Sequence, residues 1–134
     1  MPLVRIDLIK GKSQEYRSQA GAIIYRMLVE ILGVPTGDCF QVIAEHAKED
    51  QPFDRNYLGI HRSDDCMFIQ ITLNEGRSVE LKQRFYMGVT DALHEELNLR
   101  REDVLLSLVE VPKENWSYGN GAAQYVAPQS DYSK

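Results

Sequence analysis

The chain has 134 residues, of which 43% are hydrophobic and 26% are charged, a composition typical of one globular domain. Its net charge of −5 argues against a broad nucleic-acid-binding surface, which needs clustered Lys and Arg. No apolar run approaches the ~20 residues of a membrane span, and the first residues lack the pattern of a secretion signal. We therefore expect a cytoplasmic protein with reduced thiols at Cys39 and Cys66 and with no nucleic-acid or membrane partner.

The first half of the chain has the pattern of a strand, a helix and a second strand. Apolar residues alternate with polar ones over residues 4–8, which predicts a strand with one face toward a core. Ser13 is a typical helix cap, and Gly33 followed by Pro35 ends the predicted helix. The apolar stripe of this helix comprises Ala20, Ile23, Ile24, Met27, Leu28 and Ile31. The second strand is predicted from Phe40, Val42 and Ala44.

The second half repeats this plan at an offset of 65 residues. Residues 2–8 align with residues 67–73, and Gly11-Lys-Ser aligns with Gly76-Arg-Ser. The second helical stripe comprises Phe85, Val89, Ala92, Leu93 and Leu97. Residues 104–109 are almost continuously apolar, which predicts a strand covered on both faces. We therefore predict a single domain over residues 1–134, with repeat halves 2–60 and 67–126 and a flexible tail at 127–134.

Two tandem β-α-β units predict an α+β fold with a four-stranded mixed sheet and both helices on one face. The other face of the sheet is also expected to carry apolar side chains, namely Leu3, Ile9, Ile43 and Phe68. One domain has nothing left to cover them, so we expect this face to be buried against other subunits. After Pro112 the chain is rich in Gly and aromatic residues, which favours a hairpin or an arm onto a neighbouring subunit.

A tandem β-α-β chain that begins Met-Pro resembles the tautomerase superfamily, which has the tautomerase/MIF-like fold. Four segments look more specifically like its malonate semialdehyde decarboxylase-like branch: Pro2, Val34-Pro-Thr-Gly-Asp38, Gly76-Arg77-Ser78 and Asn115-Trp-Ser-Tyr-Gly119. The resemblance implies a cofactor-free enzyme that uses an amino-terminal proline and assembles as a homotrimer. The decarboxylases carry an Arg-X-Arg pattern ahead of the second helix, and here a glutamate, Glu75, replaces the first arginine.

Pro2 becomes a chain-terminal secondary amine only when Met1 is removed, and the resemblance makes it the catalytic group. An apolar pocket would lower the pKa of this amine and make it a base, whereas a nearby carboxylate would keep it a cationic acid. Both roles stay open. Arg77 begins the second helix, where it is suited to binding a substrate carboxylate. Arg62 and Arg55, in the polar connection 47–65, are further candidates for the same task.

In the resembling enzymes the position of Asp38 interacts with the amine or activates water. Its repeat copy, Asp103, equally supports a turn or capping role. Trp116, Tyr118 and Tyr125 are expected to wall the substrate pocket of an adjacent subunit, or else only to pack subunits together. The histidines and cysteines form no metal-binding pattern, so we predict no metal and treat His46 as an ordinary strand residue.

The leading hypothesis is a tautomerase or lyase that acts on a small oxo-acid or enol-acid, with catalytic residues Pro2, Asp38 and Arg77. One alternative is malonate semialdehyde decarboxylase or hydratase activity proper, against which Glu75 argues. A second is a catalytically inactive trimeric module of the same fold. A ferredoxin-like nucleic-acid binder shares the α+β layout but is disfavoured by the negative charge.

Overall fold

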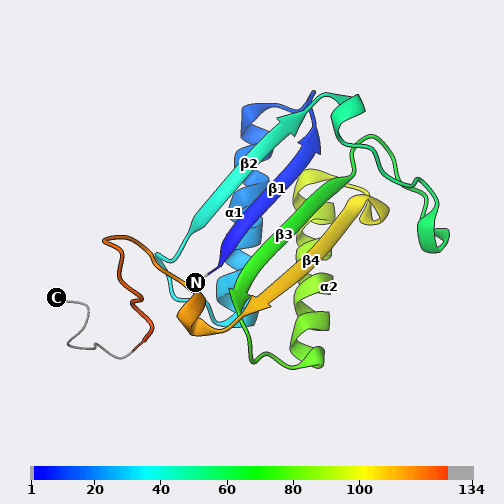
Figure 1. Ribbon diagram of the computed structural model, residues 1–134. Helices are drawn as coiled ribbons and strands as arrows, with labels where there is room; N and C mark the ends of the chain where they lie inside the picture. The colour runs from blue at the N-terminus through cyan, green and yellow to red at the C-terminus, as the bar shows by residue number, and fades with distance from the viewer. Residues whose placement is uncertain (1, 127–134) are drawn as a thin grey trace.

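Two β-α-β units follow one another in the computed structural model, which describes residues 2–126. The elements of the first unit are β1 (Leu3–Ile9), α1 (Gln14–Leu32) and β2 (Phe40–His46). Those of the second are β3 (Met67–Asn74), α2 (Val79–Leu97) and β4 (Val104–Val111). Figure 1 shows one sheet with both helices behind it, as predicted. Met1 and the predicted flexible tail at 127–134 lie outside the described residues.

The four strands form one mixed sheet in the order β2-β1-β3-β4. The strands within each unit are parallel, and the two units join through the antiparallel pair β1–β3. Leu3 pairs with Phe40 on one side and with Thr72 on the other. The start of β1, where Pro2 lies, is therefore flanked by the start of β2 and the end of β3.

The predicted internal repeat is a repeat of helix caps as well as of strands. The hydroxyls of Ser13 and Ser78 accept hydrogen bonds from the backbone N–H groups three residues later, at 3.0 and 3.2 Å. Each helix has 19 residues and ends at a left-handed residue, Gly33 (φ 71°) or Asn98 (φ 57°). The core lies between the helices and the sheet, and its fully buried side chains include Ile6, Ile24, Leu28, Ile69, Ile71, Phe85 and Leu93.

The predicted orientation of β2 is wrong. Ile43 pairs with Ile6 and packs against the core, whereas Phe40 and Val42 lie on the open face with 48% and 46% of their area exposed. Ile43 therefore does not belong to the open face, where it was expected. The apolar alternation misleads because β2 is an edge strand whose other helix-facing residues are polar.

Those polar residues, Gln41 and Glu45, contact α1. The Gln41 amide donates to the carbonyl of Gly21 at 2.9 Å, and Arg17 pairs with Glu45 at 3.1 Å. A Cβ at Gly21 would lie 2.5 Å from the Gln41 side-chain oxygen, so glycine permits this close approach of helix and strand. The strand β4 also differs from expectation, because its residues alternate in exposure instead of being covered on both faces.

The open face of the sheet carries exposed apolar residues, as predicted, and Leu3 and Phe68 are among those that were named. Leu3, Val42, Leu105 and Val109 each expose 37–46% of their area, and Phe68 is half-buried beside Phe53. An ionic cluster lies among them, in which Asp7 accepts hydrogen bonds from Arg5 at 3.0 Å and contacts His46 at 2.5 Å. Burial would raise the pKa of Asp7, but the bonds from His46 and Arg5 outweigh it and lower that pKa.

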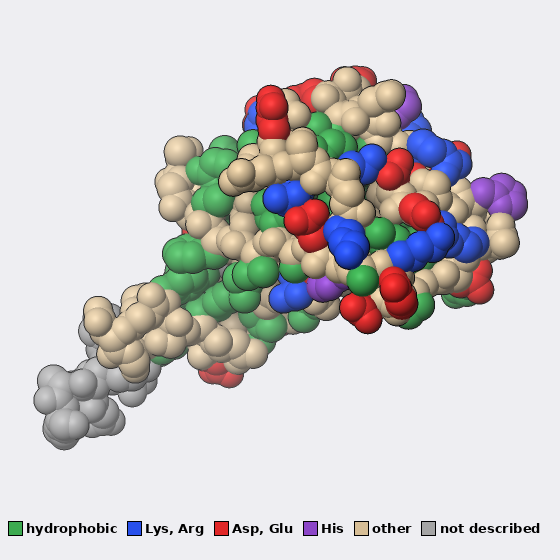
Figure 2. All heavy atoms as spheres, turned by 90° about the horizontal axis from the view of Figure 1, so that it is seen from above, with side chains coloured by type: hydrophobic (Ala, Val, Ile, Leu, Met, Phe, Trp, Pro, Cys, Tyr) green, Lys and Arg blue, Asp and Glu red, His purple; other side chains and the backbone are tan. Residues whose placement is uncertain are grey.

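The segment after β4 forms a short 3-10 helix (Lys113–Asn115) and turns. Within residues 112–126 it contains no strand, so it is an arm and not the alternative hairpin. Figure 2, seen from above, shows Lys, Arg, Asp and Glu side chains interspersed, with hydrophobic side chains gathered toward this arm. Neither helix of the described region is long and apolar enough to cross a membrane.

Candidate active site

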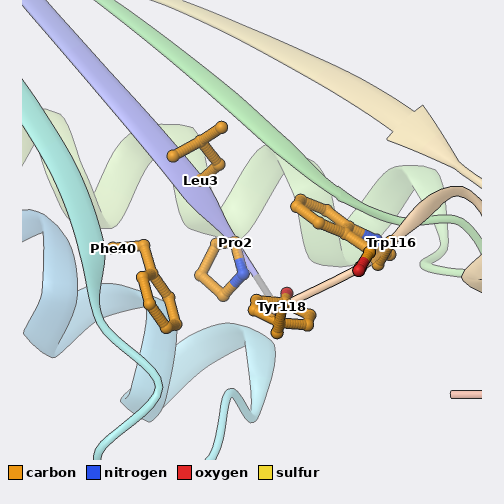
Figure 3. A pocket seen from close by; sticks show the side chains of 6 residues that line it. Pro2, Leu3, Phe40, Trp116 and Tyr118 are labelled. Atoms are coloured by element: carbon orange, nitrogen blue, oxygen red, sulfur yellow. The ribbon is translucent and has the colours of Figure 1, made fainter. Parts of the chain in front are cut away.

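Pro2 is buried at the start of β1, where it lines a hollow of about 250 Å³. The other lining residues are Leu3, Phe40, Trp116, Ser117 and Tyr118. Leu3 and Phe40 meet there because they are direct neighbours in the parallel register of β1 and β2. Figure 3 shows the Pro2 ring between Phe40 and the two aromatic residues of the arm, with its nitrogen turned toward that arm. Two of the three predicted aromatic residues, Trp116 and Tyr118, thus lie with Pro2 within one chain.

The walls of this hollow are stacked aromatic rings. Trp116 and Tyr118 lie nearly parallel, with ring centroids 5.3 Å apart and an angle of 14° between the planes. Tyr118 also contacts Phe40 at 5.4 Å and the edge of Tyr125 at 5.6 Å. Burial, together with the neighbouring Tyr125, raises the pKa of Tyr118.

Asp38 lines a second hollow of about 440 Å³ that shares Phe40 and Tyr118 with the first. It lies in the connection between α1 and β2, and its backbone N–H bonds the carbonyl of Pro35 at 3.2 Å. The turn is held further by the Gly37 N–H, which donates to the Tyr25 hydroxyl at 2.7 Å. Tyr125 lines the same hollow. Asp38 therefore lies in the hollow next to that of Pro2, on the other side of the Phe40–Tyr118 pair.

The repeat copy of Asp38 has a plainly structural role. Asp103 is fully buried and accepts hydrogen bonds from the backbone N–H and the hydroxyl of Ser63, at 2.7 and 2.5 Å. Asp38, in contrast, is half-buried and lines a hollow. The two repeat positions therefore differ in burial and in surroundings.

Arg77 lies between β3 and α2, at the same end of the sheet as Pro2, but it lines neither hollow. Its guanidinium donates to the carbonyls of Asn74 and Leu32 at 2.9 and 3.2 Å. Its Nε is buried and has no hydrogen-bond partner among the described residues. Burial lowers the pKa of Arg77, and the charge of Glu110 opposes that shift.

Arg62 lies at the opposite end of the sheet from Pro2, in the connection that joins β2 to β3. Its guanidinium donates to three carbonyls of this connection, those of Asp54, Tyr57 and Ile60, at 3.1–3.4 Å. Arg55 pairs with Asp64 at 2.6 Å and lies over the Phe53 ring. Within one chain, neither arginine is brought to the Pro2 hollow.

Comparison with known proteins identifies the family of the chain. Two family profiles, both described as tautomerase enzyme, match residues 38–119 and residues 2–53. YusQ of Bacillus subtilis (strain 168), described as a probable tautomerase, is 36% identical over 94% of this chain and 99% of its own length. The chain belongs to the tautomerase family.

Two solved structures extend the comparison. FG41 malonate semialdehyde decarboxylase inhibited by 3-bromopropiolate superposes with a TM-score of 0.86 at 33% identity, over 92% of this chain and 93% of that one. A second malonate semialdehyde decarboxylase gives a TM-score of 0.85 at 28% identity, over 92% and 95% of the two chains. The present tautomerase-family enzyme is thus related to malonate semialdehyde decarboxylases, and the predicted fold is confirmed.

The sequence pattern did not reveal two residues of the candidate site in this member of the tautomerase family. Phe40 was predicted only as a residue of the second strand, although an aromatic residue at the first position of an edge strand could have signalled a pocket wall. Asn74 is only 4% exposed and accepts a hydrogen bond from the Trp116 indole at 2.7 Å. A single polar residue at the end of the apolar strand β3 was the available signal. Glu75, which follows it, is exposed.

Proposed function

We propose that this tautomerase-family enzyme interconverts keto and enol forms of a small oxo-acid without a cofactor, using the Pro2 amine freed by loss of Met1. The observation that carries the proposal is the burial of Pro2 in an aromatic hollow whose lining includes no charged side chain. Such a lining disfavours the ammonium form of the amine. A neutral secondary amine is then present near pH 7 as a general base.

The proton transfer needs one group that accepts and returns a proton. The neutral Pro2 nitrogen takes the proton from the enol hydroxyl, and the O–H electron pair forms the carbonyl. The electrons of the C=C bond take a proton from the resulting ammonium at the adjacent carbon. The amine ends neutral, and the substrate ends as the keto acid. Asp38, one hollow away, would stabilise the ammonium transiently or orient a water molecule.

Arg77 is the proposed anchor for the substrate carboxylate. It lies at the same end of the sheet as Pro2. Its buried Nε has no acceptor among the described residues and could donate a hydrogen bond to a substrate carboxylate. The backbone N–H groups at the start of α2 also favour an anion there. The aromatic side chains Trp116, Tyr118 and Tyr125 would hold the remainder of the substrate. Arg62 is proposed only as a secondary anchor supplied by another subunit.

Decarboxylation of malonate semialdehyde is the second candidate activity, favoured by the likeness to two such decarboxylases. Two features of this chain argue for a weak activity of that kind. Glu75 replaces the first arginine of the decarboxylase pattern, and its side chain is exposed. The guanidinium of Arg77 is already bonded to two backbone carbonyls. One arginine suffices to anchor a substrate carboxylate during proton transfer. It does not replace the pair of arginines of the decarboxylase pattern around a carboxylate that is lost as carbon dioxide.

We also propose a homotrimer, in keeping with a family that typically forms oligomers such as trimers. The open sheet face supports this proposal, because it carries several exposed apolar side chains. A contiguous exposed apolar surface on a folded protein commonly marks a protein–protein interface. Assembly through that face would cover the Arg5–Asp7–His46 cluster with the apolar residues around it. The aromatic arm would then lie at a subunit boundary.

Ketonisation of a chromogenic enol acid tests the proposed activity. The protein that starts at Pro2 is compared with a form extended by an amino-terminal tag, in which the Pro2 nitrogen is a tertiary amide without basicity. We expect activity only in the first form. Equal activity of the tagged form would reject the amine as the catalytic group. No activity in either form would favour the catalytically inactive module.

A further inference from the structure

Asn74 is the last residue of β3 and stands at the end of the sheet where Pro2 lies. Leu3 pairs with Thr72, so the end of β3 runs past the start of β1. The side chain of Asn74 is 4% exposed, although the residue is polar and ends a strand. A buried side-chain amide is costly unless its polar atoms form hydrogen bonds. The hydrogen-bond partners of Asn74 therefore indicate what the residue does.

Two contacts of Asn74 lead to the two parts of the proposed site. Its side-chain oxygen accepts the indole N–H of Trp116 at 2.7 Å. Its backbone carbonyl accepts the Nη1 of Arg77 at 2.9 Å. Trp116 in turn stacks on Tyr118, and both rings line the Pro2 hollow. One residue therefore touches both the aromatic wall and the arginine proposed to hold the carboxylate.

The hydrogen bond to the indole has a specific consequence for the wall. The indole nitrogen has a single N–H donor, so the bond to the Asn74 oxygen uses the whole hydrogen-bonding capacity of the ring. Trp116 is half-buried and belongs to an arm with no strand partners, so little else in its backbone fixes the ring. Stacking on Tyr118 leaves the ring free to slide within its own plane, and the Asn74 bond removes that freedom.

We infer that Asn74 is a positioning residue that fixes the Trp116 indole as a wall of the Pro2 hollow and so sets the affinity for an aromatic oxo-acid. The inference rests on the proposed function only in taking this hollow as the substrate site. It concerns a residue that acts through Trp116 and takes no part in proton transfer.

The chain has one tryptophan, so its fluorescence reports this indole alone. In Asn74→Leu the indole loses its acceptor, and we expect a red-shifted emission, faster quenching by acrylamide and about tenfold weaker binding of phenylpyruvate. Asn74→Gln keeps an uncharged amide acceptor and is expected to restore emission and binding part of the way to the unmodified values. Gln83→Leu, an amide replaced on the exposed side of α2, serves as the matched control.

A measurement on the unmodified protein covers the case in which Asn74→Leu fails to fold. The single indole N–H resonance of 15N-labelled protein should exchange with solvent slowly, because it is hydrogen-bonded and half-buried. Fast exchange, unchanged emission in Asn74→Leu, or changed emission with unchanged phenylpyruvate affinity would each overturn the inference. Binding that depends on Asn74 without any turnover would support the inference and reject the proposed function, so the two failures are distinguishable.

Discussion

The guanidinium of Arg77 donates to the carbonyl of Leu32 at 3.2 Å, which ties the start of α2 to the end of α1. A second bond, to the carbonyl of Asn74 at 2.9 Å, ties it to the end of β3. Arg77 thus joins three elements at the end of the sheet where Pro2 lies. A residue proposed to bind substrate is here also part of the fold.

Arg77→Ala is therefore expected to change both stability and substrate binding. Loss of two charge-assisted hydrogen bonds should lower the free energy of unfolding by about 1–3 kcal/mol. Loss of the carboxylate anchor should raise KM roughly tenfold, with a smaller effect on kcat. Urea unfolding and steady-state kinetics measure the two effects, and Arg84→Ala on the exposed side of α2 is the control. Unchanged kinetics in a destabilised Arg77→Ala protein would limit Arg77 to a structural role.

The Asp7 cluster predicts a loss of stability in acid. The pKa of Asp7 is lowered in the folded protein, so its ionised form stabilises the fold above the ordinary value of 3.8. That contribution disappears as the pH falls through the lowered pKa. Asp7→Asn should cost about 1.5–3 kcal/mol at pH 7, and the difference from the unmodified protein should shrink below pH 3.8. Urea unfolding across this pH range measures the effect, with Asp50→Asn at an exposed position as control. A difference in the free energy of unfolding between Asp7→Asn and the unmodified protein that stayed constant with pH would contradict the account.

Assembly through the open sheet face is tested by a charge on that face. Val42 exposes 46% of its area in the single chain and lies in the middle of β2. Val42→Asp should yield monomers by light scattering, because a buried unpaired carboxylate is costly. Val79→Asp at the start of α2, where 64% of the side chain is exposed, should leave a trimer. A monomeric unmodified protein at micromolar concentration, or a trimeric Val42→Asp protein, would exclude this face as the interface.

Restoring the first arginine of the decarboxylase pattern should strengthen carboxylate binding. Glu75 is exposed, so its charge should affect the free energy of carboxylate binding about as much as a surface ion pair does. Removing the negative charge and adding a positive one should each strengthen binding by ~0.2–1 kcal/mol. Glu75→Arg is expected to lower KM for malonate semialdehyde about two- to thirtyfold and to raise the rate of decarboxylation. Glu80→Arg makes the same change of charge in the first turn of α2 and should have a smaller effect. Equal effects of the two substitutions would show that only net charge matters.

Local rules predicted most of this fold because each half of the chain follows them. Ser13 and Ser78 cap the helices and Gly33 ends the first one, as their types and positions indicated. The orientation of β2 was mispredicted, because Gln41 and Glu45 face a helix that pairs with them. Apolar alternation cannot distinguish a core from an interface in an edge strand.

The candidate site was only partly predictable for a related reason. The sequence shows an amino-terminal proline and an aromatic segment near the end of the chain. Their residues Pro2, Trp116 and Tyr118 line one hollow. The bond between Trp116 and Asn74 spans 42 residues, and no periodicity connects those positions. The partners of Arg77 are backbone carbonyls, which every residue offers, so its structural role could not be inferred from residue types.

The most direct test of the central claim is the rate of enol-acid ketonisation by Pro2→Ala. Its amino terminus is a primary amine without the pyrrolidine ring that packs beside Phe40 and Tyr118. We expect kcat to fall about 10²- to 10⁴-fold, the range of general acid–base catalysis, with KM nearly unchanged. Pro52→Ala, at an exposed proline, should keep full activity, and intact mass should show that each protein has lost Met1. Full activity of Pro2→Ala would contradict the account.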